Sequence, residues 1–236
     1  MSASAPARRV GKALADLRRG RPVLLYDADD RERETDFVQA APFARPADVA
    51  RFRRDGGGLI CVAVHPGAAE RLGLPFMTDV LRKAAGNGMA TLRKMSDLRL
   101  PYDARSSFSL WVNHRETFTG VTDQDRARTI RELGRAVEEA LRGEAVDFGE
   151  RFRSPGHVSI CRAAEGLLGR RQGQTELSVA LALMAGVPPA MVMCEMMDGR
   201  TGNALSKGRA RAYGERHGLV WLQGAEVVEA FSALAR

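Results

Sequence analysis

The densest group of chemically active side chains is the charged run Asp27–Asp36, in which acidic residues alternate with arginines. In an extended backbone Glu32, Glu34 and Asp36 would share one face of the chain. Clustered carboxylates repel one another unless a cation neutralises them, and oxygen ligands suit a hard ion such as Mg²⁺ or Mn²⁺. The run therefore indicates either a metal site or a solvated charged loop.

A second candidate site is the segment 170–176, directly before an apolar helical pattern. Arg171 and the Thr175 hydroxyl converge there with the free backbone amides of a helix start, next to Gly173 and Gln174. These groups together favour binding of a phosphate or another oxyanion. The alternative is an ordinary helix cap, with Thr175 as the capping residue and Arg171 exposed to solvent.

Three more side chains could serve acid–base chemistry. Glu195 follows an apolar run that reads as a buried strand, and partial desolvation would raise its pKa toward the range useful for proton transfer. His157 is a candidate base, although a lone histidine is more often simply hydrogen-bonded in place. Cys61 lies in an apolar run and is by default a core residue. Together, the candidates describe a site for metal-assisted proton transfer on a sugar phosphate.

The composition excludes several classes of protein. With 236 residues, 44% of them hydrophobic, the chain can bury a substantial core. It has no apolar run long enough to span a membrane and no secretory signal. Its three cysteines, Cys61, Cys161 and Cys194, are widely spaced, which argues against disulfides or a zinc site and suits the cytoplasm. We therefore expect a cytoplasmic protein with no membrane partner.

The net charge of +7 could suggest nucleic-acid binding. The basic residues, however, are interleaved with acidic ones, and aromatic residues make up only 6% of the chain, too few for stacking on bases. A positive field would equally attract a small phosphorylated metabolite. We expect no nucleic-acid partner.

Helical and strand patterns alternate irregularly, and no repeat or linker divides the chain. This pattern predicts a single α+β domain over residues 1–236, with a mixed sheet and surrounding helices. The expected strands cover residues 22–26, 59–64, 107–113, 157–162, 190–196 and 219–222. The expected helices cover residues 10–19, 46–54, 122–141, 175–185, 207–217 and 225–234, the third of them starting at a capping box of Thr122 and Asp125.

In its longer motifs the sequence resembles the 3,4-dihydroxy-2-butanone 4-phosphate synthases of riboflavin biosynthesis, particularly the archaeal stand-alone form. The resemblance runs from about Val10 to about Phe231 and includes residues 26–38, 57–64, 72–77, 106–122, 152–166, 171–176 and 194–199. It implies an α+β homodimer whose active sites contain residues of both subunits. It also implies a Mg²⁺-dependent lyase that converts D-ribulose 5-phosphate to 3,4-dihydroxy-2-butanone 4-phosphate and formate.

The resemblance assigns a role to each candidate residue. Arg31 matches a sugar-binding arginine, Glu32 a metal-bridging glutamate, and Asp36 the carboxylate that holds the substrate hydroxyls. The phosphate cradle matches Arg171, Gly173 and Thr175, and Thr122 falls at a position that lines the family's pocket. The catalytic candidates are then His157, Glu195, Asp36, Glu34 and Cys61.

Two positions depart from the family pattern. Gln174 stands where the family has a metal-ligating histidine; its neutral amide oxygen can bind Mg²⁺ or Mn²⁺ but supplies no imidazole, so a weak metal site of Glu32 and Gln174 is expected. Arg33 stands where the archaeal pattern has glycine, and it would place a positive charge beside the acidic cluster. Two alternatives therefore stay open: a diverged paralogue that yields a dehydrated or isomerised product, and a non-catalytic sugar-phosphate binder.

Overall fold

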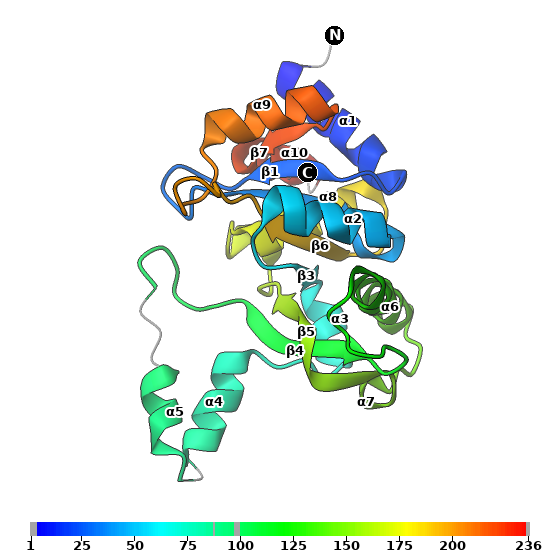
Figure 1. Ribbon diagram of the computed structural model, residues 1–236, viewed down its shortest axis with the longest axis vertical. Helices are drawn as coiled ribbons and strands as arrows, with labels where there is room; N and C mark the ends of the chain where they lie inside the picture. The colour runs from blue at the N-terminus through cyan, green and yellow to red at the C-terminus, as the bar shows by residue number, and fades with distance from the viewer. Residues whose placement is uncertain (1–3, 87, 97–99, 235–236) are drawn as a thin grey trace.

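The protein is built on one mixed seven-stranded sheet, seen in a computed structural model that describes residues 4–86, 88–96 and 100–234 (Figure 1). Two neighbouring pairs, β1 with β7 and β3 with β5, are parallel, and the other neighbours are antiparallel. In spatial order the strands are β4 (Phe108–His114), β5 (Phe152–Arg162), β3 (Cys61–Val64), β6 (Ala190–Glu195), β2 (Thr35–Ala40), β1 (Val23–Tyr26) and β7 (Trp221–Gln223).

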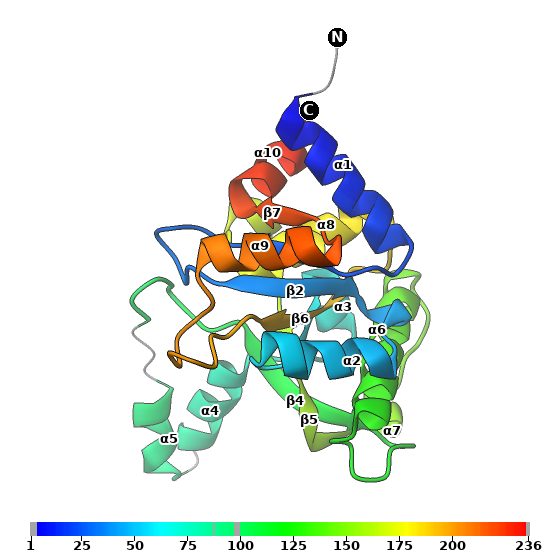
Figure 2. The same ribbon diagram turned by 45° about the horizontal axis from the view of Figure 1, so that its top comes forward.

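Helices cover both faces of this sheet. One face packs against α1 (Ala5–Arg18), α8 (Gln174–Ala185) and α10 (Gly224–Leu234). The opposite face packs against a second group of helices, two of which, α2 and α9, lie on either side of β2 in the view of Figure 2. These are α2 (Pro46–Arg51) with the π-helical turn η2 (Phe52–Gly56), α3 (Pro66–Arg71), α6 (Asp123–Leu141) and α9 (Lys207–His217). Short helices complete the chain: η1 (Ala41–Phe43), α7 (Phe148–Arg151) and η3 (Leu167–Gly169).

Strand alternation divides the buried residues between two cores. In β2, Phe37 packs with the α6 side while Val38 packs with the α8 side. Alternate side chains of a strand point to opposite faces, so Asp36 lies on the same face as Val38. In β6, Glu195 likewise shares a face with Met193, which packs with the α8 side. The two carboxylates thus lie at strand ends on the face that α8 covers.

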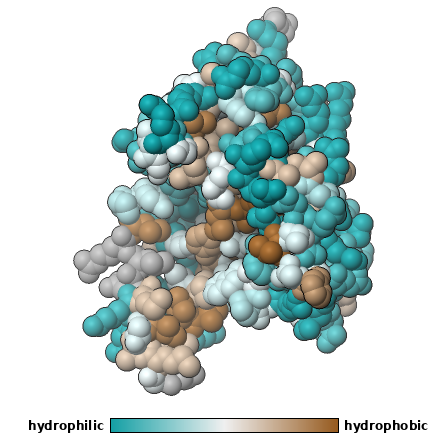
Figure 3. Space-filling view, viewed as in Figure 1, coloured by the Kyte–Doolittle hydropathy of each residue, from teal (hydrophilic) through white to brown (hydrophobic). Residues whose placement is uncertain are grey.

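A helical hairpin of α4 (Met77–Gly86) and α5 (Ala90–Met95) projects from the body of the molecule (Figure 1). Hydrophobic residues gather on it in the space-filling view (Figure 3), among them Val80, Met89 and Met95, which are 36%, 60% and 58% exposed. The sequence analysis did not predict this hairpin, although Met77, Val80, Leu81 and Ala84 recur with the spacing of an amphipathic helix.

The other expected elements are present with shifted ends. The prediction of an α+β domain with a mixed sheet and surrounding helices is confirmed. The capping box at Thr122 is half formed, since the Thr122 hydroxyl accepts a hydrogen bond from the Asp125 N–H (3.1 Å). The strand expected at residues 157–162 begins five residues earlier, because β5 pairs with β4 along a ribbon that extends beyond the rest of the sheet. Among the described helices, none is long and apolar enough to cross a membrane.

Candidate active site

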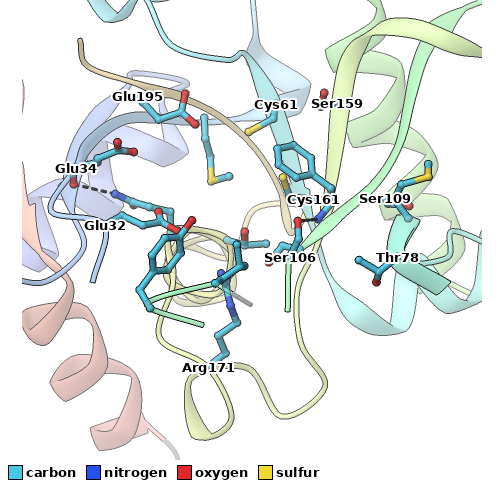
Figure 4. A pocket seen from close by; sticks show the side chains of 18 of the residues that line it. Glu32, Glu34, Cys61, Thr78, Ser106, Ser109, Ser159, Cys161, Arg171 and Glu195 are labelled. Carbon is cyan, nitrogen blue, oxygen red and sulfur yellow. Dashed lines mark hydrogen bonds between the residues drawn. The ribbon is translucent and has the colours of Figure 1, made fainter. Parts of the chain in front are cut away.

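A cavity of about 680 Å³ opens where β2, β3, β5 and β6 meet the start of α8 (Figure 4). The register of the sheet explains which side chains form the surface of the cavity on the sheet side. Asp36 pairs with Glu195 across β2 and β6, and Cys61 of β3 pairs with Ser159 of β5 and with Met193 of β6. Paired residues point to the same face of a sheet, so these side chains form one continuous surface.

Most of the residues predicted from the sequence line this cavity together. They are Arg31, Glu32, Glu34, Asp36, Cys61, Arg171, Gln174, Thr175 and Glu195. Segments that lie far apart in the sequence therefore contribute to one site: the acidic loop, two strand ends and the start of α8. This placement favours a built site over a solvated charged loop.

The acidic loop is held in shape by Asp27, a residue whose role the sequence patterns missed. One Asp27 oxygen accepts a hydrogen bond from the Glu32 N–H (2.8 Å) and the other from the Glu34 N–H (3.0 Å). These bonds turn the backbone so that Glu32 and Glu34 both face the cavity. Asp27 itself is 2% exposed, which marks it as a part of the loop's framework.

The cavity is strongly acidic, and burial disfavours the charged forms of its carboxyl groups. Burial and the neighbouring carboxylates, Glu195 first among them, raise the pKa of Asp36 well above its usual range. Burial likewise raises the pKa of Glu195, and burial together with Glu195 and Glu32 raises the pKa of Glu34 to about 7. The site can therefore hold protons at neutral pH, as acid–base chemistry requires.

Glu195 is placed by backbone groups. Its Oε2 accepts a hydrogen bond from the Leu59 N–H (2.7 Å). Gly58 lies against it so closely that a Cβ atom there would stand 2.7 Å from the Glu195 Cβ. The glycine run at the end of η2 thus gives the carboxylate its position.

Cys61 lies beside Cys161 in the cavity and is 3% exposed. The contact with the Cys161 thiol and burial raise the pKa of Cys61 well above its usual range. A thiol that stays neutral is a poor nucleophile. As a catalytic candidate, Cys61 is thus limited to lining the pocket or donating a weak hydrogen bond.

The start of α8 differs from the ordinary cap that was the alternative. Gly173 is the capping residue, not Thr175, and Arg171 is 14% exposed. Gly173 lies against the Arg171 guanidinium, where a Cβ atom would collide. The guanidinium pairs with Glu176 (Nη1 to Oε2, 2.5 Å) and with Asp103 (Nε to Oδ2, 2.5 Å), an acidic residue from a distant segment that no sequence signal identified.

Gln174 offers one free oxygen to the cavity wall. Its side-chain amide nitrogen donates to the Leu25 carbonyl and to the Glu34 carbonyl (3.1 Å each), as the dashed line to Glu34 in Figure 4 shows. These bonds fix the orientation of the amide. Its Oε1 is buried and has no hydrogen-bond partner among the described residues. A buried acceptor without a partner is costly, so this oxygen suits a cation or a ligand donor.

Three residues singled out from the sequence lie outside the cavity of their own subunit. His157 is exposed on β5, where its Nδ1 lies 3.1 Å from the Asn113 side chain, and it does not line the cavity. Thr122 caps α6 and is also outside the cavity. Arg33 is exposed and donates to the Asp29 carbonyl (2.6 Å), so it neither narrows the pocket nor lines it.

The start of α8 and carboxyl groups with raised pKa values lie in one cavity, an arrangement that would suit an enzyme acting by acid–base chemistry on a small anionic substrate. Comparison with known proteins assigns the family. The profile of 3,4-dihydroxy-2-butanone 4-phosphate synthase matches residues 11–230, and the chain belongs to this family.

Close relatives agree with this assignment. The chain is 56% identical to the 3,4-dihydroxy-2-butanone 4-phosphate synthase of Archaeoglobus fulgidus, over 92% of each chain. It is 54% identical to that of Methanosarcina mazei, over 94% of this chain and 90% of the relative. A solved synthase in complex with two magnesium ions superposes with a TM-score of 0.72 at 25% identity, over 92% of this chain and 93% of that one.

Asp36→Asn should change stability in a pH-dependent way. The folded state keeps the Asp36 proton to a higher pH than the unfolded state, whose pKa is about 3.9. Above that value the folded state binds more protons, so wild-type stability falls as pH rises. In metal-free buffer, denaturant unfolding should show the variant more stable by about 1–3 kcal/mol at pH 8 and nearly unchanged near pH 4.

Asp48→Asn is the matched control, because the pKa of Asp48 is lowered in the folded protein whereas that of Asp36 is raised. Burial alone would raise the Asp48 pKa, but hydrogen bonds from Arg45 and Gln39 lower it. That variant should lose stability at pH 8 and keep it at low pH. If both asparagine variants respond alike, the charge of Asp36 does not destabilise the fold.

Arg33→Gly should stabilise the loop relative to Arg33→Ala. Arg33 has φ = 61°, in the left-handed region that costs side-chain-bearing residues about 1 kcal/mol. Both variants lose the hydrogen bond from the Arg33 side chain to the Asp29 carbonyl. The difference between their free energies of unfolding therefore reports the cost of the backbone conformation alone. Denaturant unfolding should place the glycine variant about 1 kcal/mol above the alanine variant. Equal stabilities would mean that the loop relaxes around position 33.

Proposed function

We propose that this protein converts D-ribulose 5-phosphate to 3,4-dihydroxy-2-butanone 4-phosphate and formate. The observation that carries the proposal is the meeting of Asp36, Glu195, Gln174 and Arg171 in one cavity of a chain more than half identical to named synthases. The two alternatives, a paralogue with another product and a non-catalytic binder, are not favoured, because these relatives carry the synthase name.

The start of α8 is the proposed phosphate site. The first N–H groups of a helix have no intrahelical acceptor, and its dipole favours a negative charge there. Thr175 adds a hydroxyl and Arg171 a guanidinium at the cavity wall. With the phosphate bound there, the sugar chain would extend over the sheet toward Asp36 and Glu195.

Asp36 and Glu195 are the proposed proton-transfer pair. They are partners across β2 and β6, and burial raises the pKa of both. Two neighbouring carboxyl groups in a desolvated site share a proton, so that one serves as base while the other serves as acid. Enolisation of the ketose removes a proton beside the carbonyl, and loss of the C1 hydroxyl requires an acid. This pair supplies both functions.

Glu32 and Gln174 are the proposed ligands of a divalent cation, Mg²⁺ or Mn²⁺. Gln174 contributes its unpartnered Oε1, and Glu32 lines the same cavity. Two protein ligands would leave the other coordination positions of the ion to water and substrate oxygens, as is common for Mg²⁺. When bound, the ion would act as a Lewis acid on two neighbouring substrate oxygens.

The amide of Gln174 can replace an imidazole in one respect. A metal-ligating histidine donates its other ring N–H to a carbonyl or carboxylate, which fixes the ring. The Gln174 nitrogen makes the corresponding bonds to the Leu25 and Glu34 carbonyls. The orientation is thus preserved while an amide oxygen takes the place of the imidazole nitrogen, and we propose weak metal binding.

A homodimer would complete the site. His157 and Thr122 lie outside the cavity of their own subunit, and the loop before Thr122 carries Phe118 and Val121, which are 92% and 50% exposed. Large apolar side chains at such exposure favour an interface. We propose that His157 and Thr122 reach the cavity of a second copy.

Incubation with ribulose 5-phosphate and Mg²⁺, with formate and product mass measured together, tests the function. The expected result is one formate for each four-carbon product. Gln174→His should lower the Mg²⁺ concentration needed for half-maximal rate by about 10–100-fold, and Gln174→Leu should raise it. Consumption of the sugar phosphate without formate would instead support a paralogue with another product, and binding without turnover would support a binder.

Mixing two inactive variants tests the dimer. His157→Ala and Glu195→Gln should each be inactive alone. In randomly mixed dimers about a quarter of the sites would be intact, because half the dimers are mixed and each of those has one complete site. Formate release should therefore recover to about a quarter of the wild-type rate. No recovery after verified subunit exchange, or a monomer in sedimentation, would refute the shared site.

A further inference from the structure

An acidic side chain occupies the place where the proposed function puts the phosphate. Asp103 lies in the irregular segment 100–107, between the α4–α5 hairpin and β4. A single oxygen, its Oδ2, accepts from Arg171 Nε (2.5 Å) and from Arg31 Nη2 (3.2 Å). Both arginines line the cavity. This oxygen bridges two guanidinium groups as an oxygen of a bound phosphate would.

The charge balance around the two arginines leaves no room for a further anion. Three carboxylates face the two guanidinium groups: Asp103 pairs with both, Glu176 pairs with Arg171 (2.5 Å), and Asp27 lies 3.9 Å from Arg31. These side chains are at most 16% exposed, so solvent screens them little. A phosphate dianion can bind there favourably only if one carboxylate leaves.

Two of the three carboxylates cannot leave without disturbing the fold. Asp27 holds the backbone of the acidic loop through the Glu32 and Glu34 amides. Glu176 accepts a hydrogen bond from the Ala164 N–H (2.9 Å), which ties α8 to the segment after β5. The side chains of both are fully buried.

Asp103 is tied differently. Its other oxygen accepts a hydrogen bond from its own neighbour, the Ala104 N–H (2.8 Å), so this bond travels with the segment. The adjacent Tyr102 is 39% exposed and sits 6.0 Å from the Arg31 guanidinium. The end of the segment is held more firmly, because Arg105 pairs with Asp79 (2.9 Å) and the Ser107 carbonyl accepts a hydrogen bond from the Arg162 N–H (2.8 Å). Residues 100–104 can therefore swing away by giving up the contacts of Asp103 to the two arginines.

We propose that Asp103 is a latch, which occupies the anion site in the unliganded protein and is displaced by the phosphate group of the substrate. Asp103 then blocks the two arginines at one end of the open cavity until a phosphorylated ligand displaces it, and residues 100–104 move with it. The proposal rests on the proposed function for the identity of that ligand, a sugar phosphate, but not on the chemistry that follows.

Titration calorimetry with inorganic phosphate, in chelator and at low ionic strength, tests the latch. Asp103→Asn keeps the shape of the side chain and removes its charge. It should bind phosphate about tenfold more tightly than wild type, because the competing closed state no longer reduces the apparent affinity. Asp30→Asn, which removes an exposed charge next to Arg31, is the matched control and should change the affinity much less.

Hydrogen exchange on the wild-type protein gives a second measurement that does not depend on a variant. Saturating phosphate should speed exchange in a peptide covering residues 101–107, since residues 101–104 are released. Unchanged or weaker phosphate binding in Asp103→Asn, an equal gain in Asp30→Asn, or slower exchange with phosphate would each overturn the latch.

These outcomes are separable from failure of the proposed function. If Asp103→Asn gains phosphate affinity while the wild type releases no formate from ribulose 5-phosphate, the latch stands and the synthase activity does not. If formate is released but phosphate affinity does not rise in the variant, the activity stands and Asp103 is a residue that positions Arg171.

Discussion

The site depends on one electrostatic constraint: several carboxyl groups must share a small, poorly solvated space. Glu32, Glu34, Asp36 and Glu195 all line the cavity, and burial raises the pKa of each. Such a group is stable only where protons, cations or backbone amides offset the charge. Asp36 and Glu195 rely on protons, while the Leu59 amide also supports Glu195. Protons, cations and backbone amides that stabilise these carboxylates can also take part in acid–base or Lewis-acid chemistry on a substrate.

The cavity wall at the start of α8 carries positive charge. Arg171 and Arg31 stand beside the amide end of α8, and each is already paired with carboxylates in the unliganded protein. The cavity thus has carboxyl groups with raised pKa values at the sheet and two arginines beside the helix start, which is the proposed phosphate site. A molecule with a phosphate at one end and hydroxyls at the other matches this polarity, which orients it without a close steric fit.

The sequence predicted the parts of the site that depend on local pattern. The acidic run, the helix start after Arg171 and the strand before Glu195 each carry a periodic or capping signal, and the structure brings them together. The roles of Asp27 and Asp103 could not be predicted, because each depends on partners fixed by the folded chain: loop amides for Asp27 and two distant arginines for Asp103. The position of the Arg33 side chain outside the cavity likewise could not be predicted, because it depends on the positive φ angle of Arg33, which the pattern of side chains does not reveal. The α4–α5 hairpin was missed although the apolar residues of α4 recur with helical spacing, so the sequence did hold a signal for its first helix.

The glycine contact at Glu195 has a consequence for how such a site can change over time. Main-chain atoms and a missing Cβ at Gly58 hold the carboxylate, so few neighbouring side chains are needed to aim it. The walls that touch the rest of a ligand, in contrast, are flexible side chains of the hairpin, such as Met77 and Leu81. Substitutions of these side chains can change the shape of the cavity while the Glu195 carboxylate keeps its position and orientation. The fold therefore separates the carboxylate that main-chain geometry holds from the hairpin side chains that can be replaced, so that single replacements on the hairpin can alter which ligands fit.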